Sequence, residues 1–466
     1  MSATARLLAQ GLGPGRPLRV LAASGQLGYG VPEAALKAGI ARGPHFIGCD
    51  MGSIDVGPYY LGAGKLATTE VVTKRDLRLV LKAAVGLGVP LLIGTAGTAG
   101  AAPHLARTRA FIREIAEEEG LSFRMATIHA DMPRALLREM ATAGRTRPLG
   151  RIAALDPATI DRAAHIVGQM GTEAFIRALR TEPDVILAGR ACDTAIFAAI
   201  PQMLGYAPGP ATHMAKIIEC TSICCTPGGR DAILGTLEDE SFVLESMNPA
   251  RAATPVSVAA HSLYEQADPL HVHEPDGAVD LSAARYERLD DRRTRVSGAT
   301  WQPTLRSTIK VEGAEWCGER AVLLAGSCDP QVIENAEVII RGVRANVADI
   351  MPPDPGRPYE LFFHVYGKGA TSLFGAVPAA AAEIFFLVEV IAPTMETAHS
   401  AASVTKQYLL HHGFPGRLST GGNIAFPFTP PELPVGPAYR FSIYHVTECD
   451  DLASVFPVEV ETIGAG

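Results

Sequence analysis

The sequence of 466 residues lacks the features that mark several broad classes of protein. Its longest apolar stretch, Gly375 to Ala392, contains Glu383 and Glu389, and the core of a bilayer does not tolerate two carboxylates there. The first sixteen residues contain no apolar segment of the kind found in secretory signals. We therefore expect a cytoplasmic protein without a membrane partner.

Basic residues and paired cysteines are also scarce. There are 41 Lys and Arg against 49 Asp and Glu, for a net charge of −8, whereas nucleic-acid binding needs a basic surface. The eight cysteines form no C-x-x-C pair, and only Cys220, Cys224 and Cys225 cluster in the sequence. We interpret them as reduced, mostly buried thiols. The sequence predicts no metal site, requires no cofactor and excludes nucleic acid as a partner.

What the sequence does contain is an alternation of strand-like and helix-like segments over its first 200 residues. The strand-like segments are short and apolar throughout, which indicates a parallel sheet covered on both faces. We therefore predict an α/β fold with a Rossmann-like parallel sheet and helices on both faces. Ligands of such sheets bind beyond the carboxyl ends of the strands. The predicted strands are 18–23, 45–50, 90–95, 123–130 and 184–189.

The length predicts two or three domains, and the pattern changes after about residue 205. We predict a parallel α/β region over 1–205, a mixed α/β continuation over 206–350 and a small α+β C-terminal domain over 356–466. The last boundary rests on the proline-rich segment 351–358. Periodicity also predicts helices over 156–168 and 329–350 and a strand over 256–264.

Glycine-rich loops follow the first and third predicted strands, as Ser24-Gly-Gln-Leu-Gly-Tyr-Gly30 and Gly94-Thr-Ala-Gly-Thr-Ala-Gly100. The first has the spacing G-x-x-G-x-G, which differs from the dinucleotide fingerprint, and nothing matches a P-loop. Such loops before helices can bind anionic oxygens through backbone N–H groups. For the second loop, tight strand–helix packing is the alternative. The predicted substrate-binding residues are Ser24, Gly25, Gly28, Gly94, Thr95 and Gly97.

Polar side chains follow the second and fourth predicted strands. Asp50 and Asp55 can form an acid–base site, in which Ser53, Tyr59 and Tyr60 would bind substrate; alternatively, the two carboxylates cap turns. His129 follows the fourth strand and is a candidate for proton transfer, although a structural histidine is the commoner case.

The fifth predicted strand ends in Gly189-Arg-Ala-Cys-Asp-Thr194. Arg190 can clamp a substrate carboxylate with both of its fork nitrogens. Asp193 can cap the next helix or take part in catalysis. Cys192, near a helix start, is a weaker nucleophile candidate.

Three features lie further along the chain. His261 is a candidate substrate-binding residue. The run His271-Val-His-Glu274 has metal-ligand spacing if it is a strand, but its flanking prolines favour a loop. Lys310 and Glu312 alternate along a strand-like run, and we expect them to form a surface pair.

Together these loops resemble the acyclic terpene utilisation (AtuA) family. The resemblance covers most of the chain, roughly residues 18 to 360, and the tail is similar to a shorter version of the family's C-terminal region. It rests on the two glycine loops, on Asp50-Met-Gly-Ser-Ile-Asp-Val-Gly-Pro-Tyr-Tyr-Leu-Gly62, and on Gly168-Gln-Met-Gly171, Gly189-Arg-Ala-Cys-Asp-Thr-Ala195, Asn248-Pro249, Ala260-His-Ser-Leu-Tyr264 and Gly422-Asn-Ile-Ala-Phe-Pro-Phe428. The resemblance implies a link to catabolism of citronellol- and geraniol-type terpenes, and it assigns no catalytic residue.

We expect a catabolic enzyme that acts on a small carboxylate or an acyl-CoA by lyase, hydratase or isomerase chemistry. Asp50, Asp55 or His129 would move protons, and Arg190 would hold a carboxylate. One alternative is a non-catalytic metabolite-binding or scaffold subunit. Another is a metal-dependent hydrolase that uses His261, His271, His273 and nearby carboxylates. Enzymes of this size are often symmetric homo-oligomers, and we expect one here.

Overall fold

A computed structural model describes residues 1–464 except 265, 353–355, 357, 373–380 and 418–422. The chain forms two compact units, a large one of residues 1–315 and 441–466 and a small one of residues 316–440. The junctions between these units lie elsewhere than the domain boundaries predicted from the sequence. Part of the predicted boundary segment 351–358 lies outside the described residues, and the three predicted domains remain a prediction.

A ten-stranded sheet forms the centre of the large unit, in the order β12-β13-β9-β8-β1-β2-β3-β7-β4-β19. Five neighbouring strands are parallel, and they confirm the five predicted strands: β1 (Leu18–Ser24), β2 (Phe46–Asp50), β3 (Leu91–Gly94), β7 (Val185–Ala188) and β4 (Phe123–Ile128). The flanking strands are antiparallel: β8 (Ile233–Leu237), β9 (Ser241–Ser246), β13 (Arg293–Ser297), β12 (Arg285–Arg288) and β19 (Val458–Ile463).

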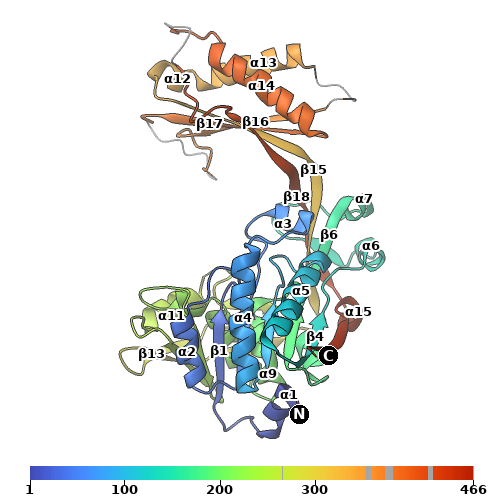
Figure 1. The fold of residues 1–466 in the computed structure, drawn as a ribbon, viewed down its shortest axis with the longest axis vertical. Coiled ribbons are helices and arrows are strands. Elements are labelled where there is room, and N and C mark those ends of the chain that lie inside the picture. The colour runs from blue at the N-terminus through green and yellow to red at the C-terminus, as the bar shows by residue number, and fades with distance from the viewer. Residues whose placement is uncertain (265, 353–355, 357, 373–380, 418–422, 465–466) are drawn as a thin grey trace. The chain divides into compact units, whose positions relative to one another are not determined.

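Helices cover both faces of the parallel strands, which explains why these strands are apolar throughout. Leu21 and Ile47 pack on one side, whereas Val20 and Phe46 pack on the other, and all four are fully buried. One face is covered by α2 (Glu33–Ala41), α4 (Glu70–Leu87) and α5 (Ala102–Glu119), which lie side by side in Figure 1. The other face is covered by α8 (Thr172–Leu179), α9 (Asp193–Met203) and α10 (Pro208–Ile218).

Two predicted elements of the large unit are wrong. Residues 156–168 form only a short helix, α7 (Pro157–Arg162), followed by strand β6 (Ala163–Gln169), because β6 pairs antiparallel with β15 (Thr308–Ser327). The predicted strand 256–264 is instead helix α11 (Pro255–Ser262). Thr254 and Ser257 form a capping box at its start, and this local signal outweighs the apolar composition.

The small unit has an antiparallel sheet of β16 (Glu360–Tyr366), β17 (Ile384–Ala392) and the second part of β15. The predicted helix 329–350 is divided at Asn335 into α12 (Pro330–Glu334) and α13 (Ala336–Ile350). Helices α13 and α14 (Met395–His411) contribute buried side chains to the same core as the sheet. The chain returns to the large unit within β18 (Glu432–Glu448).

The remaining elements of the described chain are short. They are α1 (Ala3–Ala9), α3 (Pro58–Ala63), α6 (Arg134–Thr142), β5 (Thr146–Pro148), a 3-10 turn (Thr221–Cys224), β10 (His271–Glu274), β11 (Gly277–Asp280), β14 (Thr300–Pro303) and α15 (Leu452–Val455).

None of the helices in the described ranges combines the length and the apolar character that a membrane crossing requires.

Candidate active site

A cavity of about 220 Å³ lies beyond the carboxyl ends of β1 and β2, in the large unit. The structure brings five of the residues predicted from the sequence to its wall: Gly25, Asp50, Ser53, Asp55 and Asp193. No side chain fits at Gly25, because its Cβ would lie 2.9 Å from the carbonyl oxygen of Glu219. This close approach of two backbones brings the end of α10 to the cavity.

Three buried or partly buried carboxyl groups meet in the cavity wall: Asp50 at the end of β2, Asp193 at the start of α9 and Glu219 just after α10. Asp50 is 5% exposed and Glu219 is 4% exposed. Burial raises the pKa of Asp50 well above its usual range, and repulsion by Asp193 and Glu219 raises it further. Backbone N–H groups of Met51 and Gly52 donate to the Asp50 carboxylate and oppose the rise.

Glu219 is the most informative of the three groups. Burial raises its pKa to about 8, aided by the charge of Asp193 and a hydrogen bond with it, while Lys216 opposes the rise. A carboxyl group with this pKa is mostly protonated at neutral pH and can donate a proton. The cavity therefore combines a proton donor with neighbouring carboxylates that can accept one.

Lys216 lies one turn before Glu219 on α10. Its Nζ donates to Glu219 Oε1 at 2.8 Å, and both side chains are less than a tenth exposed. Burial alone would lower the pKa of Lys216, but the charges of Glu219 and Asp193 outweigh it and the pKa is raised. The ammonium group therefore stays charged and offsets one carboxylate of the cluster.

The backbone around the cavity is strained. Thr98 lines the cavity with φ 95°, and Thr221, beside the lining residue Cys220, has φ 56°. A β-branched residue with positive φ is a genuine outlier, and such residues collect at functional sites. Thr95, with φ 50°, belongs to the same loop as Thr98. The observed strain favours this cavity as the functional site.

The first glycine loop binds an internal carboxylate. The N–H groups of Gly28 and Gly30 both donate to Asp76 Oδ2 at 2.9 Å, and that of Val31 donates to Oδ1 at 2.9 Å. Asp76, on α4, is completely buried. The loop is thus the anion-binding turn expected from its sequence, but the protein supplies the anion. Its N–H groups at Gly28 and Gly30 are not directed to a substrate.

The second glycine loop packs tightly, as the alternative interpretation of its sequence proposed. A Cβ at Gly94 would lie 2.4 Å from the Ile196 side chain, and one at Gly100 would lie 2.1 Å from the backbone nitrogen of Arg190. Thr95 Oγ1 exchanges hydrogen bonds with the backbone of Ala191. Only Thr98 of this loop reaches the cavity.

Arg190 makes its bidentate contact inside the protein. Its Nε donates to Glu312 Oε2 at 2.8 Å and its Nη2 donates to Oε1 at 3.3 Å. Lys310 Nζ lies 3.0 Å from the same carboxylate. The predicted pairing of Lys310 with Glu312 is thus confirmed, but its predicted surface location is wrong, because Glu312 is fully buried. The antiparallel pairing of β6 with β15 covers this segment. The sequence suggested that the Arg190 guanidinium holds a substrate carboxylate, whereas in the structure it holds the carboxylate of Glu312.

Five other predicted residues and the segment His271–Glu274 lie away from the cavity wall. His129 Nε2 is 3.3 Å from Glu459 Oε1, and the Tyr59 and Tyr60 rings pack edge to face at 5.3 Å. The ring of His261 packs against that of the lining residue Tyr264, with their centroids 5.0 Å apart. Ser24, buried, accepts a hydrogen bond from Gln26 N.

The segment His271-Val-His-Glu274 forms strand β10, so the predicted loop is wrong. Its hydrogen bonds to β11 hold it extended despite the flanking prolines. Among the described residues, no group of three His, Cys, Asp or Glu side chains is arranged to hold a metal ion.

Sequence reasoning missed Glu219 and Lys216. Their signal was weak but present: a Lys and a Glu spaced i, i+3 in the otherwise apolar run from Met214 to Cys220. Charged residues within an apolar helical run are buried only when paired. That rule singles them out once the helix is assigned.

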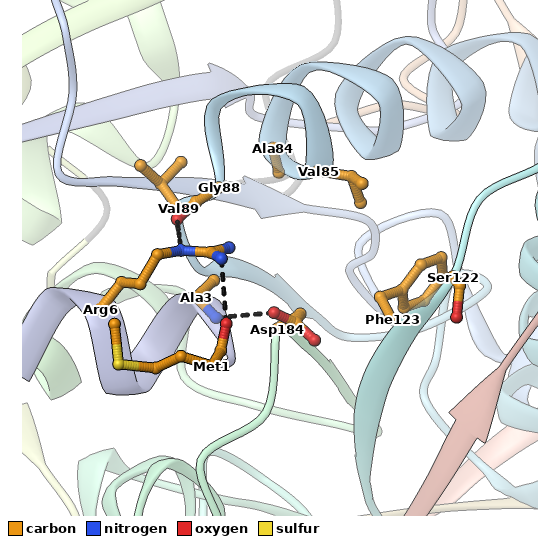
Figure 2. A pocket seen from close by; sticks show the side chains of 10 residues that line it. All are labelled: Met1, Ala3, Arg6, Ala84, Val85, Gly88, Val89, Ser122, Phe123 and Asp184. Atoms are coloured by element: carbon orange, nitrogen blue, oxygen red, sulfur yellow. Dashed lines mark hydrogen bonds between the residues drawn. The ribbon is translucent and has the colours of Figure 1, made fainter. Parts of the chain in front are cut away.

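Two other hollows in the large unit have polar groups that already bond to one another. One, of about 270 Å³, lies at the opposite, amino ends of β3, β4 and β7 (Figure 2). There Arg6 donates to the carbonyl oxygens of Gly88 and Met1, and Asp184 accepts from Ala3 N. These bonds attach the N-terminal helix to the sheet.

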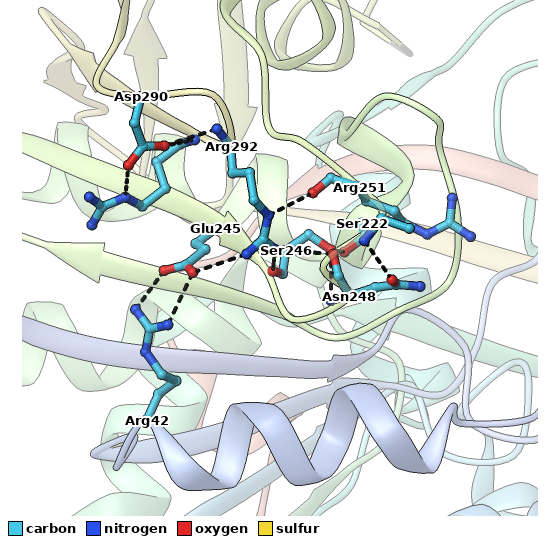
Figure 3. A network of polar contacts seen from close by, with 10 residues as sticks. Arg42, Ser222, Glu245, Ser246, Asn248, Arg251, Asp290 and Arg292 are labelled. Atoms are coloured by element: carbon cyan, nitrogen blue, oxygen red, sulfur yellow. Dashed lines mark hydrogen bonds and ion pairs between the residues drawn. The ribbon is translucent and has the colours of Figure 1, made fainter.

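The second hollow, of about 490 Å³, is an open depression of alternating charges (Figure 3). Arg42 donates to both oxygens of Glu245. Arg292 donates to the carbonyl oxygen of Ser246 at 2.7 Å and approaches Glu245 at 3.8 Å. Because these cations already have acceptors, neither hollow competes with the acidic cavity as a catalytic site.

The fold and the cavity define an α/β protein with a carboxyl-rich site beyond the ends of parallel strands. The model of the acyclic terpene utilisation family protein AtuA matches residues 76–229 and 238–428, more than half of the chain. The chain therefore belongs to this family. The match includes Asp193 and Glu219 but not Asp50 or the first glycine loop. No curated protein and no solved structure matches the chain.

Proposed function

We propose that this protein is a catabolic enzyme that performs acid–base chemistry of the lyase, hydratase or isomerase type on a small carboxylate or acyl-CoA intermediate. Its family is linked to acyclic terpene utilisation, which is consistent with such a role. The observation that carries the proposal is the meeting of Asp50, Asp193 and Glu219 in one cavity wall. Burial and mutual repulsion raise the pKa values of Asp50 and Glu219, so the cluster holds protons beside a negative charge, as paired acid–base chemistry requires.

The proposed roles follow from the surroundings of each group. Glu219 holds a proton at neutral pH and donates it to the leaving or accepting atom. Asp193, which faces the cations Lys216 and Arg190, carries the negative charge and takes a proton from substrate. Asp50, held by two backbone N–H groups, shares the remaining proton with this pair. None of these steps requires a cofactor.

The fold supports the same location. We propose that the parallel strands are used in the Rossmann-like manner, with substrate beyond their carboxyl ends. Strained loops and buried titratable groups coincide there, and this combination is typical of active sites. We further propose that the enzyme is a cytoplasmic homo-oligomer, as is common for enzymes of this size.

The test is turnover of a panel of hydroxy and enoyl acids, free and as CoA esters, by wild type, Glu219→Gln and Asp193→Asn. General acid–base groups contribute roughly 10²–10⁴-fold, so we expect each variant to lose that much of kcat. Asp291→Asn is the matched control, because it removes one carboxylate from an exposed side chain on the surface of the large unit. Undiminished turnover in both cavity variants would remove the proposed acid and base. Saturable binding without turnover by wild type would favour a metabolite-binding subunit.

A further inference from the structure

We propose that the cavity accepts the uncharged acyl end of its substrate, an ester or thioester carbonyl, and rejects the corresponding free carboxylate. The inference rests on the proposed function and selects between the two substrate forms that it leaves open. It also assigns Asp55, at the rim of the cavity, as the residue that sets this preference.

The charges in the cavity wall oppose an anion. Four carboxyl groups, of Asp50, Asp55, Asp193 and Glu219, line the cavity, and no basic side chain among the described residues lines it with them. Lys216 behind the wall is less than a tenth exposed, and its ammonium group donates to Glu219. Even with two of the four groups protonated, the wall does not become positive. Like charges placed side by side repel, and this repulsion selects against a ligand of the same sign.

The backbone offers little compensation. An anion without basic side chains is usually bound by the N–H groups of a glycine-rich turn. Here the turn that follows β1 has given its N–H groups at Gly28, Gly30 and Val31 to Asp76, and that of Leu27 donates to the Asp50 carbonyl oxygen. A carboxylate that entered the cavity would therefore give up its water without gaining the N–H donors of this turn, which is costly.

An uncharged carbonyl group suits the cavity wall better than a carboxylate does. It needs one hydrogen-bond donor, and protonated Glu219 supplies one. The volume of 220 Å³ is that of about seven water molecules, which admits a short acyl chain. In a CoA ester the carboxylate of the free acid is replaced by an uncharged thioester carbonyl. Its phosphates, which are many bonds away, need not enter the cavity.

Asp55 is positioned to act as the selective charge. It lies in the loop between β2 and α3, is exposed, and contributes to the wall beside Ser53. Ser53 Oγ accepts a hydrogen bond from Asp55 N at 3.0 Å and fixes the turn. Because the side chain is exposed, replacing it with Asn should leave folding intact while removing one negative charge from the entrance.

The experiment measures the binding of crotonic acid and of its N-acetylcysteamine thioester, by calorimetry at pH 7.5. This thioester is neutral and lacks nucleotide and phosphate groups, so it tests the acyl end alone. For wild type we expect the thioester to bind at least tenfold more tightly than the acid. In Asp55→Asn we expect this ratio to fall at least threefold through tighter binding of the acid. Asp291→Asn, which makes the same change of net charge on the surface, should keep the wild-type ratio.

Equal or tighter binding of the acid by wild type overturns the inference, and so does the absence of saturable binding of either compound. A preference for the thioester that Asp55→Asn leaves unchanged overturns the assignment of Asp55. The measurement requires no turnover. Failure of the proposed acid–base roles would instead appear as undiminished kcat in Glu219→Gln, so the two failures are distinguishable.

Discussion

Replacing Glu219 with Gln should remove a large pH dependence of stability. In the folded protein the pKa of Glu219 is about 8, against an ordinary value of 4.5. Folding therefore favours the protonated form, and this contribution is complete below pH 4.5 and is lost as pH rises through 8. The difference between the folded and the ordinary pKa corresponds to a free energy of unfolding of about 5 kcal/mol, at about 1.36 kcal/mol per pKa unit. Because Asp50 and Asp193 share in the titration, we expect an observed difference of about 2–4 kcal/mol.

The assay is urea unfolding of wild type and Glu219→Gln at pH 5, 7 and 9. Wild type should lose about 2–4 kcal/mol more than the variant between pH 5 and pH 9. Asp291→Asn is the control, since it removes one carboxylate from a side chain that is 91% exposed and lies outside the cavity wall. Parallel pH profiles for wild type and Glu219→Gln would refute the argument that Glu219 holds a proton in the folded state.

Three further predictions test other contacts. Asp76→Asn should lower the free energy of unfolding by about 1–3 kcal/mol, because three backbone N–H groups lose a charged acceptor; denaturant unfolding with Asp291→Asn as control checks this, and an unchanged midpoint would contradict it. Arg190→Met should cost about 3–5 kcal/mol, reduced by the remaining contact of Lys310 with buried Glu312; a loss below 1 kcal/mol in the same assay would argue against the buried pair. Gly100→Ala should abolish the cooperative thermal transition or lower its midpoint by several degrees, because the new Cβ meets the backbone of Arg190 at 2.1 Å with φ at 69°; an unchanged midpoint would show that the loop can move aside.

The parallel sheet could be predicted because its determinants are local. Segments such as Leu18–Ser24 and Val185–Ala188 are buried on both faces, so their sequences are apolar without interruption. The end of helix α5 is likewise fixed locally, by Gly120 in the left-handed conformation. The errors came where distant contacts decide. No local sequence signal identifies β6 as a strand, because its partner, β15, lies about 150 residues further along the chain.

Part of the candidate site could be predicted from the sequence for the same reason. Asp50 ends strand β2, and Asp193 lies in the segment just beyond β7, so the rule about the carboxyl ends of parallel strands identified both. Glu219 follows a helix, and only the tertiary fold brings it to Asp193. The glycine loop after β1 binds a carboxylate through its backbone N–H groups, but its sequence does not reveal that Asp76, 46 residues from Gly30, provides that carboxylate. A motif specifies which chemistry a loop can perform and leaves the identity of the partner open.

The division of the chain has a consequence for biosynthesis. The small unit, residues 316–440, is inserted between two parts of the large one, and β19 pairs with β4 only after Val458–Ile463 has been made. Until then β4 is an exposed edge strand, which is prone to pair with other chains. The large unit therefore cannot complete its sheet during translation until the small unit has left the ribosome. Premature termination within the insertion would release a chain with an open, aggregation-prone edge.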